Sequence, residues 1–304
     1  MYWITAVLIG HGLNALSYVL DKVLLTKSIK NPFAFTFYIG LLGLLIVVAA
    51  PWGLFLPSAS LLIVDLLAGV FFSSALLFFF LALQTGETSR IVPFIGGAIP
   101  VFTYIFAFFF LQERLTSLQL WGFIVLVIGT ILMALEDKKK ISNLQSKKLS
   151  RQKWLFGILA ALSFALSFGL SKIAFDYQPF LSAFIWTRFG GFFFPVLFLF
   201  SKNLRQEIFK AALVFKEKTG LMYLVAQTFG AGGYIFINYA ISLASVSLVN
   251  AMQGVQYVFI LVIALLGTIK YPNLLKENMS RKNLLIKILA VAVITAGLSL
   301  IAFS

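Results

Sequence analysis

Apolar residues occur along the chain in long blocks that short polar segments separate, for example over residues 41–50, 75–83 and 284–303. A run of about 20 apolar residues matches a hydrocarbon core of about 30 Å. Lipid cannot satisfy backbone hydrogen bonds, so such runs must form helices or closed barrels. Barrel strands span about 10 residues and alternate polar with apolar positions. The blocks here are longer and do not alternate, which predicts an all-α integral membrane protein.

The blocks predict ten transmembrane helices, whose ends are uncertain by a few residues. The expected ranges are 3–21, 33–50, 61–83, 91–111, 117–135, 154–174, 181–200, 220–242, 246–268 and 284–303. Most connections between them are short, and two are long. The first, 136–153, is polar and basic and is interpreted as a cytoplasmic linker between two halves.

The second long connection, 201–219, predicts an amphipathic helix on the membrane surface. Its apolar residues share one side of the helix, and they are Leu204, Ile208, Phe209, Ala212 and Phe215. The basic Lys202, Arg205 and Lys210 lie elsewhere on it.

The two halves resemble each other, which indicates an internal duplication. The stretch 15–22 matches 165–172 at an offset of 150, and Asn31-Pro32-Phe33 matches Gln178-Pro179-Phe180 at an offset of 147. We therefore divide the chain into a five-helix repeat at 1–135, the linker, and a more divergent five-helix repeat at 154–304. An odd number of spans inverts the second copy, and inverted repeats are a transporter architecture with a substrate site between the copies.

Composition supports the membrane assignment, because 61% of the residues are apolar and only 11% are charged. The net charge of +14 does not indicate nucleic-acid binding, since the basic residues occupy the short segments between apolar blocks. Cysteine is absent, which excludes disulfides and thiolate metal sites. The first residues, Met1-Tyr2-Trp3, carry no basic charge, so we expect a retained first helix and no cleaved signal peptide.

The basic residues also predict an orientation in the cytoplasmic (inner) membrane. Of the 24 Lys and Arg residues, 21 fall on one side of the predicted spans, Arg114 and Lys172 fall on the other, and Arg188 lies within a span. Positive charge is retained in the cytoplasm. The charge bias therefore places both termini outside.

Residues 82–130 carry a family resemblance. They include Ala82-Leu83-Gln84, Pro100-Val101-Phe102-Thr103 and Gln112-Glu113-Arg114-Leu115-Thr116, and then Gly122 and Gly129. This stretch resembles the EamA-like branch of the drug/metabolite transporter superfamily, and Arg188 after Pro179 is similar to its second-span pattern. The second half departs from the pattern, since 258–261 lacks the Pro and Thr and 271–281 lacks Glu-Arg. The resemblance implies ten spans, transport activity and cytoplasmic termini, opposite to the charge count.

Polar groups inside lipid are costly and face the bundle interior or a water-filled cavity. In the first span His11, Asn14, Tyr18 and Asp21 share a helix face. We expect them to line a cavity; the alternatives are interhelical hydrogen bonding, or, for Asp21, simply the end of the helix. Asp65 and Asp21 are the candidate proton sites.

The eighth and ninth spans provide uncharged polar candidates for the same cavity. These are Gln227, Tyr234, Asn250, Gln253 and Tyr257, which suit a small polar or amphipathic ligand. Hydrogen bonds that join neighbouring helices are the alternative. Asn238 lies on the same face as Gln227 and Tyr234.

Arg188, about eight residues into its span, is a candidate for holding a carboxylate or phosphate. A structural ion pair or a snorkelling side chain is the alternative. The fourth span contains four residues that disfavour a regular helix and are expected to break it near the membrane centre, with bending for packing as the alternative. They are Pro93, Gly96, Gly97 and Pro100.

These features predict a secondary transporter or permease that moves a small metabolite or amphipathic solute by alternating access. The alternative is a lipid flippase or a membrane helper subunit. No P-loop is present and the acidic residues are scattered, so we expect no enzyme activity, no cofactor and no metal. The expected partners are a small-molecule substrate and membrane lipid, and not nucleic acid; a homodimer is left open.

Overall fold

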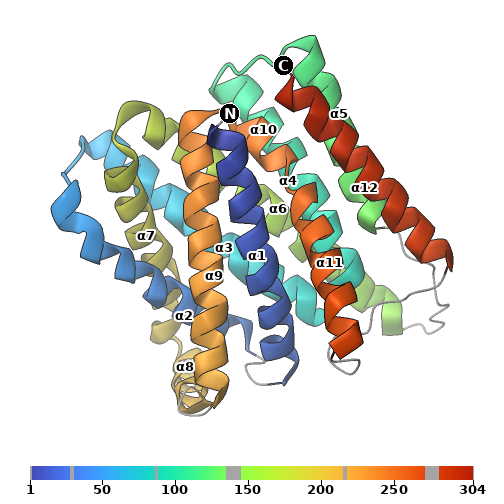
Figure 1. Cartoon of the computed structure of the whole chain (residues 1–304). Coiled ribbons are helices and arrows are strands. Elements are labelled where there is room, and N and C mark those ends of the chain that lie inside the picture. The colour runs from blue at the N-terminus through green and yellow to red at the C-terminus, as the bar shows by residue number, and fades with distance from the viewer. Residues whose placement is uncertain are drawn as a thin grey trace.

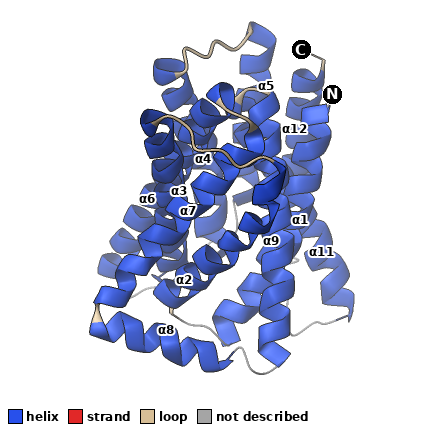
Figure 2. Cartoon of the chain, turned by 90° about the vertical axis from the view of Figure 1, so that its left-hand side faces the viewer, coloured by secondary structure: helices blue, strands red, loops and turns tan. Residues whose placement is uncertain are grey.

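The structure is a computed structural model, which describes residues 2–27, 31–85, 88–134, 145–214, 218–270 and 281–303. Within these ranges the chain is helical and contains no strand (Figure 2). The elements are α1 (Tyr2–Lys27), α2 (Pro32–Gly43), η1 (Leu44–Trp52), α3 (Ala59–Thr85), α4 (Thr88–Phe110), α5 (Ser117–Ala134), α6 (Gln145–Tyr177), α7 (Phe180–Val196), η2 (Leu197–Phe200), α8 (Lys202–Val214), α9 (Lys218–Leu243), α10 (Val246–Ala251), α11 (Gly254–Lys270) and α12 (Arg281–Ala302).

Each of the ten predicted ranges is largely helical in its described residues, and the ninth, 246–268, is interrupted between α10 and α11. Eight of the helices in the described ranges are long and apolar enough to cross a membrane, and the apolar segments Phe94–Phe110 and Ser117–Leu132 are shorter. Large apolar side chains cover the outside of the bundle, and Phe109 and Phe200 are 71% and 84% exposed. Such a surface is suited to lipid and not to water. The chain is a multi-pass helical membrane protein.

The helices pack in a few extensive pairs, α3 on α6, α1 on α9, α5 on α12 and α3 on α7. Glycines allow the close approach that membrane helices use. A Cβ atom on Gly190 would lie 2.1 Å from the main-chain oxygen of Leu66, so a larger residue would separate α7 from α3. Figure 1 shows both termini at the same end of the bundle, with α5 and α12 side by side at one edge.

Helix α8 lies across the opposite end of the bundle (Figure 2). The amphipathic helix is confirmed over Lys202–Val214. Its packed side contains Leu204 and Ile208, and the hydroxyl of Tyr38 donates to the main-chain oxygen of Ile208 at 2.9 Å. Phe209 is 61% exposed and does not pack on the bundle. The side chain of Ala212, and Phe215 entirely, lie outside the described residues.

The Glu113-to-Thr116 segment fixes the end of the bundle near the termini. Thr116 caps α5, because its Oγ1 accepts from the Gln119 amide at 3.2 Å while Gln119 Oε1 accepts from the Thr116 amide at 3.1 Å. This reciprocal pair is a capping box. The carboxylate of Glu113 accepts from Ser245, the residue that caps α10. The family-like segment therefore joins the first half of the chain to the second.

Candidate functional site

A cavity of about 690 Å³ lies inside the bundle. Its wall comes from both halves of the chain, from α1, α2, η1, α3 and α4 and from α6, α7, α9, α10 and α11. Pockets that take small ligands have volumes of about 300–1,000 Å³. The cavity is therefore large enough to enclose a small organic molecule.

All nine residues that we predicted from the sequence to line a cavity do line this cavity. They are His11, Asn14, Tyr18, Arg188, Gln227, Tyr234, Asn250, Gln253 and Tyr257. Asp21 and Gly96 line it as well, whereas Asn238 does not. Asn238 instead turns its side-chain nitrogen to the main-chain oxygen of Tyr234 at 2.9 Å.

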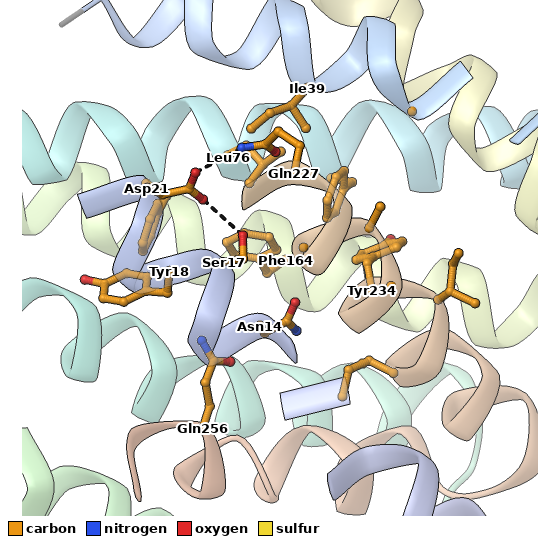
Figure 3. Close-up of a pocket in the computed structure, with 18 of the residues that line it drawn as sticks. Asn14, Ser17, Tyr18, Asp21, Ile39, Leu76, Phe164, Gln227, Tyr234 and Gln256 are labelled. Atoms are coloured by element: carbon orange, nitrogen blue, oxygen red, sulfur yellow. Dashed lines mark hydrogen bonds between the residues drawn. The ribbon is translucent and has the colours of Figure 1, made fainter. Parts of the chain in front are cut away.

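Helices α1 and α9 provide a polar wall that ends at Asp21 (Figure 3). One carboxylate oxygen of Asp21 accepts from Gln227 Nε2 at 3.0 Å, and the other accepts from the Ser17 hydroxyl at 3.3 Å. Asn14 lies further along the same helix, where Gly233 of α9 makes room for it: a Cβ there would lie 2.2 Å from Asn14 Oδ1. The carboxylate thus lies on the cavity wall with both oxygens engaged.

A helix break places four further polar residues on the wall. Between α10 and α11 the amide of Gln253 bonds to the oxygen of Asn250 at 3.1 Å, and the amide of Gln256 to that of Gln253 at 3.0 Å. These bonds reach three residues back, as in a 3₁₀ turn, and not four. Because the winding changes here, Gln256 and Tyr257 both line the cavity together with Asn250 and Gln253. A single face of a regular helix does not predict this set.

The break predicted in the fourth span is wrong, because α4 is helical throughout Thr88–Phe110 and contains Pro93 and Pro100 within that range. Gly96 has a packing role: a Cβ on it would lie 1.8 Å from the hydroxyl oxygen of Tyr257. Gly97 faces away from the cavity, with Ile131 of α5 3.3 Å from its Cβ position. The interrupted helix is thus the ninth predicted span, where α11 begins at Gly254.

Another part of the wall is a cluster of rings from four helices, which we call the aromatic cluster. Its rings contact one another edge-on, tilted or stacked, and they are Phe72 of α3, Phe164 and Phe168 of α6, Phe184 of α7 and Tyr234 of α9. Its closest ring centroids, those of Phe72 and Tyr234, are 4.3 Å apart. Sequence reasoning missed the four phenylalanines, because 34 Phe residues in a membrane chain give no signal for those that face inward.

Arg188 lies against this cluster. Its guanidinium carbon is 4.2 Å from the ring centre of Tyr234, 4.5 Å from that of Phe72 and 5.2 Å from that of Phe184. A desolvated cation–π contact contributes about 2 kcal/mol, and a central arginine costs a membrane helix about 3 kcal/mol. The rings therefore offset much of the burial of this charge. They supply no hydrogen-bond acceptor of carboxylate strength.

Asp65 lies away from the cavity. Its side chain is fully buried and accepts from Gln178 Nε2 at 2.7 Å, at the junction of α6 and α7. Asp65 does not line the cavity, whereas Asp21 does. The two candidate proton sites are thus in different environments, and Asp21 is the one that a solute in the cavity could meet.

In the described ranges no three His, Asp or Glu side chains gather closely enough to hold a metal ion. The charged groups of the wall are Arg188 and Asp21, and its remaining polar groups are amides, hydroxyls and the imidazole of His11. Such groups can orient a small solute through hydrogen bonds and charge.

The structure is thus a multi-pass helical bundle with an internal cavity walled by both halves of the chain. Residues 1–135 match the model of the EamA-like transporter family, which is part of the drug/metabolite transporter superfamily. The resemblance seen in the sequence is thereby confirmed. The family consists of transporters and not, in general, of enzymes.

Comparison with solved structures supports the fold of the whole chain. One crystal structure is similar with a TM-score of 0.65 at 17% identity, and the match covers 97% of this chain and 97% of that one. At this identity the likeness concerns the fold alone. The comparison with curated proteins finds no match.

Proposed function

We propose that this protein is a secondary transporter that moves a small amphipathic solute across the cytoplasmic membrane by alternating access. The observation that carries the proposal is the cavity itself, because it lies within the bundle and is walled by both halves of the chain. A wall that combines polar side chains with an aromatic cluster suits a solute with both a polar and an apolar part. The EamA-like domain supports transport as the activity.

Ten crossings in two inverted repeats form part of this proposal. Helix contacts support it, because they recur when the halves are exchanged: α3 packs on α6 as α9 packs on α1, and α4 packs on α6 as α11 packs on α1. The second and seventh spans also resemble each other, because each begins as an α-helix (α2 and α7) and ends as a 3₁₀ helix (η1 and η2). In such an arrangement the two halves can rock about a central site.

Flux measurement in proteoliposomes tests the activity. Vesicles that contain the purified protein are loaded with a panel of small carboxylates, amines and neutral metabolites, and the efflux is followed by mass spectrometry. Ala231→Trp places an indole on the cavity wall and is expected to abolish flux, whereas Ala296→Trp, on the exposed side of α12, is expected to retain it. Efflux of no solute from vesicles with the unaltered protein would contradict transport.

Alternating access has a clean test, because the chain contains no cysteine. Single cysteines at Gln227, near the end of the bundle that carries α8, and at Ser245, at the end near the termini, are labelled with a membrane-impermeant maleimide. We expect a transported solute to change the two labelling rates in opposite directions. Rates that do not respond to a transported solute would contradict this mechanism.

The orientation that we propose has both termini outside, on the basis of the 21-to-2 bias in basic residues. A fluorescent-protein or phosphatase fusion to the C-terminus tests this directly. We expect phosphatase activity and no fluorescence. A fluorescent fusion with a cytoplasmic C-terminus would refute the orientation and leave the transport proposal standing.

A further inference from the structure

The charges on the cavity wall are not paired with each other. Asp21 is the carboxylate on the wall, and its two oxygens already accept from Gln227 and Ser17. Arg188 makes no hydrogen bond and no ion pair with the part of the chain that the structure describes, and its Nε and Nη2 atoms are buried without an acceptor. The positive charge therefore lacks an acidic counterpart within the described protein.

The surroundings of Arg188 explain how it can remain in place without a carboxylate. Phe72, Phe184 and Tyr234 present their ring faces or edges around the guanidinium. Gly43 of α2 lies beside the side chain, and a Cβ there would be in ordinary van der Waals contact with Arg188 Cδ at 3.6 Å. Rings hold a cation but accept hydrogen bonds only weakly, so the planar donors of the guanidinium keep their capacity to bind an anion.

We propose that the cavity binds a small organic anion, a carboxylate on an apolar or aromatic body, with Arg188 as the anion-binding residue and the aromatic cluster as the seat of the body. The proposal rests on the transport function proposed above and names its substrate class. A guanidinium matches a carboxylate through two parallel hydrogen bonds.

Other solute classes fit this wall less well. An amine bound at the Arg188 position would place a second positive charge there, and a neutral solute would leave the guanidinium with no counter-charge. A phosphate carries close to two negative charges at neutral pH, and the described wall offers one arginine to meet them. A carboxylate balances the single charge, and amides such as those of Asn14 and Gln253 remain available for a second polar group of the solute.

Matched ligands test the inference on the full chain in lipid nanodiscs. The probes are 3-phenylpropionate, its carboxamide, and 3-phenylpropylamine, which share the ring and differ in the polar group. We expect calorimetry to show the carboxylate binding about 10-fold or more tightly than the carboxamide, as for one charge-assisted pair. The amine should bind most weakly. This comparison uses the unaltered protein, so it is decisive even if a variant fails to fold.

Variants identify the residue responsible. R188Q is expected to abolish the preference for the carboxylate over the carboxamide, and R188K to retain only part of it, because an ammonium lacks the planar fork. The matched control is K172Q, which also removes a basic residue. Lys172 pairs with Asp176 at 2.9 Å and does not line the cavity, so its loss should leave the preference intact.

The outcomes separate this inference from the proposed function. Equal or tighter binding of the carboxamide or the amine overturns the inference, as does a preference that R188Q leaves unchanged, or no binding of the carboxylate at all. Flux of amines or neutral solutes alongside such a result would leave transport standing. An Arg188-dependent preference for the carboxylate, with no flux of any solute in proteoliposomes, would instead overturn the transport proposal and leave the anion site.

Discussion

Two carboxylates in this bundle accept a hydrogen bond from a glutamine, yet they lie in different environments. Asp65 of α3 accepts from Gln178 at 2.7 Å, is fully buried and lies away from the cavity. Asp21 of α1 accepts from Gln227 of α9 at 3.0 Å and lies on the cavity wall. The same pair of residue types can therefore serve to hold helices together or to face a solute, and burial decides which.

The Asp65–Gln178 and Asp21–Gln227 pairs also lie between helices that correspond in the two halves of the chain. In the two-repeat arrangement that we propose, α3 corresponds to α9 and α6 to α1. The Asp65 pair links α3 to the end of α6, and the Asp21 pair links α9 to α1. Since the two helix pairs are among the most extensive in the bundle, we expect the enclosed pair to matter for stability and the cavity pair to matter for transport.

The largest effect on stability is expected from Gln178→Leu. The substitution removes the only donor that reaches Asp65 within the described residues, and a buried polar group that loses its partner costs about 1–3 kcal/mol. We expect a clear fall in the thermal unfolding midpoint in detergent. Gln227→Leu is the matched control and should lower it less, because Asp21 retains Ser17 and faces the cavity. Equal losses would remove the distinction between the two pairs.

A second effect concerns transport and its coupling to protons. If Asp21 carries the proton, Asp21→Asn keeps the side-chain volume and an acceptor oxygen but cannot be protonated and deprotonated. We expect flux driven by an imposed pH gradient to fall about 10-fold, comparable to the loss of one charge-assisted interaction, while the unfolding midpoint changes little. Flux measured with and without the gradient checks this. An unchanged response to the gradient would exclude Asp21 as the proton site.

The smallest effect is expected from Asp65→Asn. An asparagine at this position can still accept from Gln178 Nε2, and the position does not line the cavity. We expect flux, and its response to a pH gradient, to stay within about twofold of the unaltered protein, since a surviving hydrogen bond in a membrane protein changes little. Loss of the pH response in this variant, with Asp21→Asn unaffected, would reverse the assignment.

The sequence did not reveal the Asp65–Gln178 hydrogen bond, because the matching residues Asn31 and Gln178 have different hydrogen-bond partners. Asn31 and Gln178 occupy matching positions before Pro32 and Pro179. The shorter Asn31 caps α2, because its side-chain oxygen accepts from the amides of Phe33 and Ala34. Gln178, one methylene longer, makes no such cap and reaches Asp65 instead. The sequence match predicted equivalent positions and could not predict that the two residues have different partners.

The sequence by itself determined the helical membrane fold, the approximate ranges of the ten apolar segments and the residues of the polar wall. The physical reason is the cost of polar groups in lipid, which forces His11, Asn14, Gln227 and the others inward whatever the details of packing. The same cost applies to Asp65, however, which is buried equally well by a protein partner. Sequence could identify the polar residues that avoid lipid, but not the surface that each of them meets.

The tertiary structure alone decided how these residues combine. It places the break in the ninth span and not in the fourth, and it packs Tyr257 closely against Gly96. It also assembles five rings from four helices beside Arg188. Contacts between residues distant in sequence depend on how helices approach one another, which no local pattern of apolar and polar positions encodes.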